Sequence, residues 1–351
     1  MTSSSRIGHT ISQRYTIHEQ IGKGGFAQVF RALDNHTQQI VALKILHPPQ
    51  KTETDGKIAE RFLREAAVQQ KLSHPNLLSI LDVASDGDTS YIVMELLEGH
   101  DLRQQLENKG PLSPEEAIPL FIQALEAIHV AHQEDIIHRD LKPENLFILF
   151  PESPMPRMKV LDFGIARINL EQTITLTGQM LGTNKYLAPE YIQDNIASPA
   201  LDIYQIGLVL VEALKGSPVI NTQNAIVGMR QHLRGDIPIP RKLLESSLGP
   251  ILMRALALNH LNRYQTAQAF ADDLRCIDPE IIPSGSSLYD CIELSTFSKL
   301  ESLDLSSSEE EAIPTRNSPK TPRQKSKSIA IILGVFIGII CISIGIFFSM
   351  Q

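Results

Sequence analysis

The sequence is short of cysteine and has no excess of basic residues, and each scarcity excludes a class of protein. Its three cysteines, Cys276, Cys291 and Cys341, are far apart and odd in number. They therefore make neither a disulfide framework nor a metal site, and they suit a reducing cytosol. The net charge of −8 gives no sign of nucleic-acid binding, so we expect no such partner.

The N-terminus lacks an apolar core. Residues 1–12 are rich in Ser and Thr, so we expect a mobile segment there and no secretory signal peptide. With 351 residues, 42% of them hydrophobic and 21% charged, the chain can bury a substantial core of ordinary globular composition.

One stretch carries most of the chemistry. Residues 136–148 read IIHRDLKPENLFI and place three functional groups between two apolar runs. Asp140 can accept a proton from a hydroxyl. Lys142 can lie against the charge that develops on a transferred phosphoryl group. Asn145 offers a neutral oxygen to a metal ion. A polar loop between two buried strands is the plainer interpretation of the same residues.

The stretch resembles the catalytic loop of the eukaryotic-type serine/threonine protein kinases found in bacteria, whose pattern H-R-D-L-x-x-x-N it fits residue for residue. The resemblance implies an α+β, bilobal protein-kinase fold with a small β-rich N-lobe and a larger helical C-lobe. It implies ATP and Mg²⁺ as cofactors, with Mn²⁺ as an alternative ion, and protein substrates. Asp140, Lys142 and Lys44 would be the catalytic residues.

The segment before Lys44 is similar to the glycine-rich loop of that family, a hairpin that folds over nucleotide phosphates. Ala27 replaces the third glycine of the family pattern, and alone the motif also fits a plain hairpin. The expected ATP-binding residues of this loop are Ile21, Gly22, Lys23, Gly24, Gly25, Phe26, Ala27, Gln28 and Val29.

Lys44 ends the apolar strand that begins at Val41, where a lysine needs an anionic partner. By resemblance it holds the α- and β-phosphates and pairs with Glu65 on a helix expected over 58–72. An exposed lysine and glutamate are the alternative. The segment that holds Glu95 and Leu97 resembles the family's hinge between the lobes, where their backbone groups would bind the adenine edge.

The next segment completes the implied metal site and supplies regulatory residues. Asp162 of the D-F-G motif would hold Mg²⁺ together with Asn145. Thr175 and Thr177, and more weakly Thr173, are the expected phosphosites of the activation segment. Thr183 matches the family threonine that bonds to the catalytic aspartate and lysine, and with Lys142 it favours Ser/Thr over Tyr substrates.

Three further residues have structural roles implied by the resemblance. Asp202 opens an apolar helix over 201–214 and would anchor the catalytic loop from beneath. Glu190 of the A-P-E motif would form a buried pair with Arg263. We place the kinase domain at residues 13–277. A pseudokinase acting as a nucleotide-binding scaffold is the alternative, but every catalytic position of the family pattern is filled.

Past Asp278 the composition changes. Residues 278–328 are rich in Ser, Glu, Pro and Thr, so we expect a disordered juxtamembrane linker. Residues 329–348 contain no charge and would span ~30 Å as a helix, enough to cross a bilayer. The basic residues just before them place the kinase domain in the cytoplasm by the positive-inside rule, although a solvated basic tail is the plainer interpretation. We therefore expect a single-pass cell-membrane protein in contact with lipid.

A short tail, 349–351, follows the expected span, so we expect no external sensor domain. Gly334 and Gly338, with Gly345 on the same face, would let two such helices approach closely as a homodimer. Glycine is also simply frequent in membrane spans.

Overall fold

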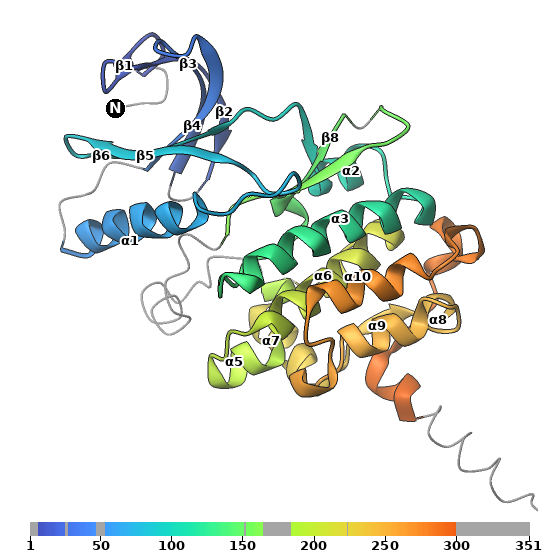
Figure 1. Cartoon of the computed structure of the whole chain (residues 1–351). Coiled ribbons are helices and arrows are strands. Elements are labelled where there is room, and N and C mark those ends of the chain that lie inside the picture. Colours follow the sequence, from blue (N-terminus) through green and yellow to red (C-terminus); the bar gives the residue numbers. More distant parts are fainter. Residues whose placement is uncertain are drawn as a thin grey trace, which may run out of the picture. The chain divides into compact units, whose positions relative to one another are not determined.

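The computed structural model describes residues 6–24, 27–46, 53–150, 152–163, 184–222 and 224–299. The described chain forms a β-rich N-terminal lobe with one long helix and a C-terminal lobe made mainly of helices (Figure 1). The expected α+β, two-lobed fold is confirmed.

The elements follow one another in the order β1 (Thr10–Ile11), β2 (Tyr15–Lys23), β3 (Ala27–Asp34), β4 (Gln39–Leu46), α1 (Glu53–Gln69), β5 (Ile80–Asp86), β6 (Thr89–Glu95), β7 (Gly99–Asp101), α2 (Leu102–Asn108), α3 (Pro114–Gln133), η2 (Pro143–Asn145), β8 (Leu146–Leu149), β9 (Arg157–Val160), η3 (Asn184–Tyr186), α5 (Pro189–Asp194), α6 (Pro199–Lys215), α7 (Ala225–Arg234), β10 (Pro238–Pro240), α8 (Arg241–Leu244), α9 (Gly249–Ala255), η4 (His260–Asn262), α10 (Ala267–Arg275), η5 (Pro279–Ile281), η6 (Gly285–Leu288) and β11 (Cys291–Glu293). The elements labelled η are single turns of 3₁₀ helix.

The N-terminal lobe is a six-stranded antiparallel sheet in the order β1-β2-β3-β4-β6-β5. Strand β4 is buried on both faces, because side chains alternate along a strand. Val41, Leu43 and Ile45 pack into one apolar cluster, whereas Ala42 and Leu46 pack into a second cluster together with α1. Lys44 shares the face of Ala42 and Leu46, so it lies on the side of the sheet that α1 covers.

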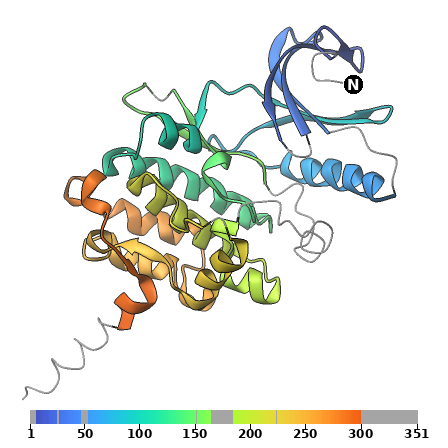
Figure 2. The ribbon, with the colours of Figure 1, turned by 180° about the vertical axis from the view of Figure 1, so that it is seen from behind.

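Helix α1 begins and ends earlier than the expected range of 58–72. Phe62 and Ala66, one turn apart, are buried against the sheet. Figure 2 shows α1 from behind, lying along the sheet on the side of the C-terminal lobe. Glu65 belongs to this helix, but its side chain is outside the described part of the structure.

The C-terminal lobe is built around α6, in which every residue from Ala200 to Leu214 is buried. A helix that is apolar on all sides needs neighbours on all sides, and α3, α9 and α10 pack against it. Helix α3 starts where Ser113 and Glu116 form a capping box with Pro114 in the first turn, a pattern that the local sequence Ser113-Pro114-Glu115-Glu116 carries.

Two expectations about the chain ends are wrong where the structure describes them. Residues 6–12 are not a loose tail, because β1 pairs with β2 and the backbone N–H of Ser12 donates to Asp86 Oδ2 at 2.7 Å. Sequence composition missed this pairing because β1 is only two residues long.

Residues 279–299 are likewise folded rather than linker. Strand β11 pairs with β10, and Ile282, Leu288 and Leu294 are buried in the core of the C-terminal lobe. The segment has too few apolar residues to show a periodicity, and the edge of β10 supplies its partner. Within the described ranges no helix is long and apolar enough to cross a membrane, and the expected span at 329–348 lies outside them.

Candidate active site

The loop 138–145 brings its three functional side chains together. Lys142 Nζ donates to Asp140 Oδ2 at 2.7 Å. The single turn η2 bends the chain back, so that Asn145 Nδ2 donates to the Asp140 carbonyl at 2.7 Å and to its Oδ2 at 3.3 Å. Asp140 is thus held in place by an ammonium and by a carboxamide, two and five residues later in the chain.

Asp162 faces this loop from the end of β9 and is paired with a residue of the other lobe. Lys44 Nζ donates to Asp162 Oδ1 at 2.6 Å across 118 residues of sequence. Desolvation alone would raise the pKa of Asp162, but the Lys44 ammonium outweighs it and holds that pKa below its usual value. The carboxylate is therefore ionised, and 42% of the Asp162 side chain remains exposed and open to a further ligand.

The His138 side chain connects the loop 138–145 to the residues on either side of Asp162. The ring is fully buried, and this burial lowers its pKa. A neutral ring fits both of its contacts, because Nε2–H donates to the Leu161 carbonyl at 2.7 Å and Nδ1 accepts the Asp140 backbone N–H at 3.3 Å. The ring also lies against Phe163, with centroids 4.7 Å apart.

Asp202 supports the loop from the start of α6, where it is fully buried. Its Oδ2 accepts the backbone N–H of His138 at 2.8 Å, and its Oδ1 accepts that of Arg139 at 2.8 Å. His132 Nε2 lies 2.7 Å from Oδ2 as well. These contacts hold the Arg139 backbone in the left-handed region, with φ of 66°, directly before Asp140.

Glu190 and Arg263 form the buried pair that the sequence suggested. Arg263 Nη1 and Nη2 each lie 2.8 Å from one carboxylate oxygen of Glu190. The three remaining N–H groups of the guanidinium donate to the carbonyls of Ala200, Ala257 and Leu258. All five donors of Arg263 are therefore used.

The glycine-rich segment forms the β2–β3 hairpin. Gly22 lies opposite Val29 and Lys23 opposite Gln28, with a register shift before Gly22. Gly24 N–H donates to the Ala27 carbonyl at 2.8 Å, and Ile21 is half exposed. Gly25 and Phe26, at the tip, lie outside the described residues.

The hinge residues connect β6 to β7. Glu95 ends β6, where its side chain accepts the Ser79 backbone N–H at 2.7 Å, and Leu97 lies in the link itself. The expected phosphosites Thr173, Thr175 and Thr177, and also Thr183, fall outside the described residues.

The comparisons with known proteins agree with this geometry. The model of the protein kinase domain matches residues 15–280. The chain belongs to the protein kinase family. Its curated relatives include the serine/threonine-protein kinase PrkC of Bacillus subtilis, 38% identical over 77% of this chain and 41% of that protein. PknB of Mycobacterium tuberculosis is 32% identical over 93% of this chain and 52% of its own length.

PknA of the same species is 33% identical over 78% of this chain and 63% of its own length. All three relatives are serine/threonine kinases by name, and the chain spans between 41% and 63% of their lengths. The matched range 15–280 ends before β11, so the folded segment 281–299 lies past the family model.

Sequence reasoning missed a buried network next to the catalytic loop. Arg103 Nη1 lies 2.7 Å from Glu212 Oε1, Nη2 donates to the Tyr186 hydroxyl at 2.9 Å, and Nε reaches Glu144 at 3.2 Å. Tyr186 in turn donates to Glu212 Oε2 at 2.6 Å. Burial and the Glu212 carboxylate raise the pKa of Tyr186, so it stays a donor.

Gln205 was missed as well. Its Oε1 accepts the Leu141 backbone N–H at 3.0 Å, and its Nε2 donates to the Tyr186 carbonyl at 3.1 Å. The sequence held a signal for the Gln205 contacts and for the pair of Arg103 and Glu212. Asp202, Gln205 and Glu212 are polar residues of an otherwise apolar helix, and such residues need buried partners.

Proposed function

We propose that this protein is an active serine/threonine kinase that transfers the γ-phosphoryl group of ATP to Ser and Thr hydroxyls of proteins. The observation that carries the proposal is the cluster of Asp140, Lys142 and Asn145 beside the Lys44–Asp162 pair. The cluster combines a proton acceptor, two ammonium groups and two oxygen donors, which are the groups that phosphoryl transfer requires. A scaffold that lacks activity would not need all of them.

Each residue of the cluster has a separate task. Asp140 orients the substrate hydroxyl and accepts its proton. Lys142, which contacts Asp140, lies where it can offset charge on the transferred group. Lys44 is 15% exposed, and from β4 it would hold the phosphates of the nucleotide. The glycine-rich hairpin would cover those phosphates, and the backbone of Glu95 and Leu97 would hold the adenine edge.

The donor set fits Mg²⁺, or Mn²⁺ in its place. Asp162 offers an ionised carboxylate, and Asn145 uses its amide nitrogen on Asp140, which leaves its oxygen for an ion. Two oxygen ligands suit an ion that takes its other ligands from phosphate and water. When bound, the ion would neutralise charge on the β- and γ-phosphates.

The first test is Asp140→Asn, which keeps the shape of the side chain and removes the proton acceptor. We expect turnover to fall by roughly 10²–10⁴-fold while the KM for ATP hardly changes. Asp88→Asn, in an exposed turn, is the matched control. Autophosphorylation at the wild-type rate in Asp140→Asn would show that Asp140 does not have this role.

The second test is Asp162→Asn, which removes the metal-binding charge. We expect it to raise the concentration of Mg²⁺ needed for half-maximal rate, because one anionic ligand is lost. The measurement is a Mg²⁺ titration at fixed ATP. An unchanged titration curve counts against Asp162 as a ligand.

We further propose autophosphorylation at Thr175 and Thr177, with Thr173 as a weaker site. A segment with few apolar residues orders itself at a cost, and a phosphate can supply the missing contacts by pairing with an arginine such as Arg139. The double change to Ala should lower the rate on an external substrate well below wild type. Full activity in that variant would show that no phosphate is needed.

We also propose that residues 329–348 anchor the kinase to the cell membrane, with its catalytic domain in the cytoplasm. The support is the uncharged run and the basic residues at 316–327 before it. Those charges would add ~1 kcal/mol each at anionic lipid. Replacing Ile337 and Ile340 by Lys should move the protein from the membrane to the soluble fraction. Retention of this double variant in the membrane pellet after a carbonate wash contradicts the anchor.

The same run could hold two copies together through Gly334 and Gly338. Paired helices would raise the effective concentration of one kinase domain near another, which favours phosphorylation in trans. Changing both glycines to Ile should lower the yields of crosslinked dimer and of phosphothreonine at matched expression. Wild-type levels of both would leave the helix as an anchor only.

A further inference from the structure

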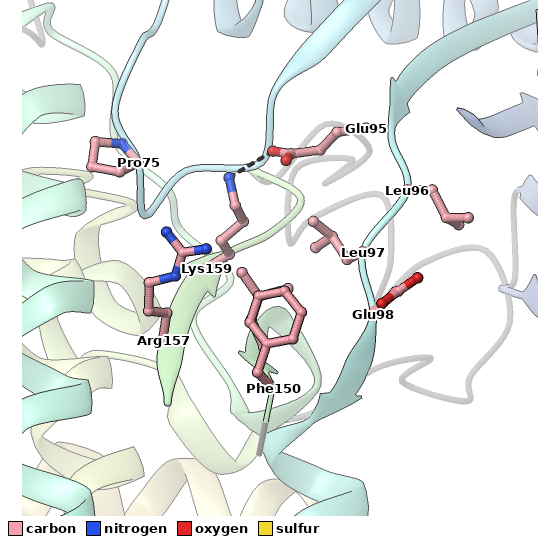
Figure 3. Close-up of a pocket in the computed structure, with 9 residues that line it drawn as sticks. Pro75, Glu95, Leu96, Leu97, Glu98, Phe150, Arg157 and Lys159 are labelled. Carbon is pink, nitrogen blue, oxygen red and sulfur yellow. Dashed lines mark hydrogen bonds and ion pairs between the residues drawn. The ribbon is translucent and has the colours of Figure 1, made fainter. Parts of the chain in front are cut away.

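A cavity of about 380 Å³ lies behind the hinge, between residues 95–98 and the β8–β9 hairpin (Figure 3). Its volume falls in the range of small-ligand sites, roughly 300–1,000 Å³. In Figure 3 the side chains of Glu95 and Leu97 point toward the cavity, whereas those of Leu96 and Glu98 point to the other side of the hinge segment. The side chains that face the cavity have no part in the proposed reaction, for which Glu95 and Leu97 would use only backbone groups.

Two cations line the cavity, and only one of them has a carboxylate partner. Arg157 and Lys159 lie two residues apart on β9, so they share a face of the strand. Lys159 is buried, and its Nζ donates to Glu95 Oε1 at 2.7 Å and to the Leu77 carbonyl at 2.9 Å. Arg157 is exposed, and no carboxylate of the described residues lies within ion-pair distance of it. Arg157 is therefore the group that an anion entering this cavity would meet.

Phe150 supplies an aromatic surface next to this cation. The guanidinium carbon of Arg157 lies 5.8 Å from the centre of the Phe150 ring. Half of the Phe150 residue, 49%, is exposed, and its backbone has φ of 50°, which is uncommon for a large residue. A strained residue persists where its surroundings hold it, and such strain gathers at ligand sites. The chain holds an apolar ring open to solvent at the mouth of the cavity.

We propose that this cavity binds a small aromatic anion. The ring of the ligand lies against Phe150 and Leu97, and its carboxylate or phosphate pairs with the Arg157 guanidinium, whose fork matches either group. The site is separate from the adenine side of the hinge, so it is occupied whether or not nucleotide is bound.

The test measures binding of 2-naphthoate to the full-length chain by fluorescence. The chain contains no tryptophan, so the naphthyl emission is read without tryptophan background. We expect Arg157→Gln to weaken binding at least tenfold, as loss of a charge-assisted contact does. The neutral analogue 2-naphthamide should bind wild type at least tenfold more weakly than the acid, and Phe150→Leu should weaken binding of both compounds.

Arg254→Gln is the matched control. Arg254 also lies over an aromatic ring, 4.1 Å from the centre of Tyr264, but it has Asp273 within 3.6 Å and lies outside the cavity. Its variant should bind 2-naphthoate as wild type does. Three results overturn the proposal: no binding to wild type, equal binding to Arg157→Gln, or displacement of 2-naphthoate by saturating ATP and Mg²⁺, which would place the probe in the adenine cleft. Each change is at an exposed position, so we expect both arginine variants to stay folded, and circular dichroism melts of the two check this.

Discussion

Substitutions of Asp202 should show whether this residue stabilises the fold, positions the catalytic loop, or does both. Its buried carboxylate accepts two backbone N–H groups of the catalytic loop, each at 2.8 Å, and contacts His132 at 2.7 Å. A hydrogen bond to a charged group contributes about 1.5–3 kcal/mol, and a buried donor left unpaired costs about 1–3 kcal/mol.

Two substitutions at Asp202 should differ in a way that the geometry specifies. Asp202→Ala leaves three buried donors without a partner, and we expect a loss of about 3–5 kcal/mol in the free energy of unfolding. Asp202→Asn keeps one acceptor for Arg139. His132 can accept from the new amide if its proton moves to Nδ1, which has no partner. Two donors, the His138 N–H and the buried His132 Nδ1–H, then lack a partner, one fewer than in Asp202→Ala. We therefore expect a smaller loss, of about 2–4 kcal/mol.

Both variants should also slow turnover. In Asp202→Ala the Arg139 backbone, at φ of 66°, is free to relax once its N–H loses the Asp202 acceptor, and Asp140 is the next residue. In Asp202→Asn the His138 N–H, two residues before Asp140, loses its acceptor instead. A shift of about 1 Å at a catalytic group can cost about 10²-fold in rate. We therefore expect Asp202→Asn to lower kcat by roughly ten- to a hundredfold with little change in the KM for ATP.

The assays are urea unfolding followed by far-ultraviolet circular dichroism and steady-state kinetics on a peptide substrate, with Asp88→Asn as control. If Asp202→Asn unfolds at a lower urea concentration but turns over at the wild-type rate, Asp202 supports the fold and not the position of Asp140. If the Ala variant is no less stable than the Asn variant, the count of orphaned donors is wrong.

Three further predictions concern the fold. Glu190→Ala should lower the free energy of unfolding by about 3–5 kcal/mol, because the Arg263 guanidinium stays buried without its carboxylate. In urea unfolding, the double variant Glu190→Ala with Arg263→Met should lose less than the sum of the two single losses, and full additivity would refute the coupling. Asp34 accepts from Arg14 Nε at 2.9 Å and Nη2 at 2.8 Å, and this hydrogen-bonded pair is the main reason why the pKa of Asp34 lies well below its usual value. The pair's contribution to the free energy of unfolding is present above the unfolded pKa of ~3.9 and is lost as the pH falls further. Asp34→Asn should therefore destabilise the protein at pH 7 and progressively less below pH ~4, and a pH-independent loss would contradict this. Leu288→Ala should cost about 2–5 kcal/mol, as for a buried leucine, and a loss under ~0.5 kcal/mol would mean that residues 279–299 are not part of the folded lobe.

Much of this molecule could be predicted from the sequence, because the patterns involved are local. The capping box at Ser113 and Glu116 sets the start of α3 by hydrogen bonds within one turn. The three groups of the catalytic loop come together because a single turn joins Asp140 to Asn145. The alternation along β4 places Lys44 on the face that α1 covers.

What tertiary structure alone decided are the contacts between distant segments. Lys44 meets Asp162 across 118 residues, and Glu212 meets Arg103 across 109. The sequence shows that a lysine on an apolar strand and a glutamate in an apolar helix each need a partner, because an unpaired buried charge is too costly. It does not say which of many carboxylates or cations is the partner.

The folded segment 279–299 shows the same limit. Strand β11 is three residues long and has no periodicity of its own, and it forms because β10 offers an open edge. Ile282, Leu288 and Leu294 gain their stability only from the surface of the C-terminal lobe. A stretch of chain with this composition is disordered alone and ordered on such a surface, since the apolar area that offsets its conformational entropy belongs to another part of the molecule.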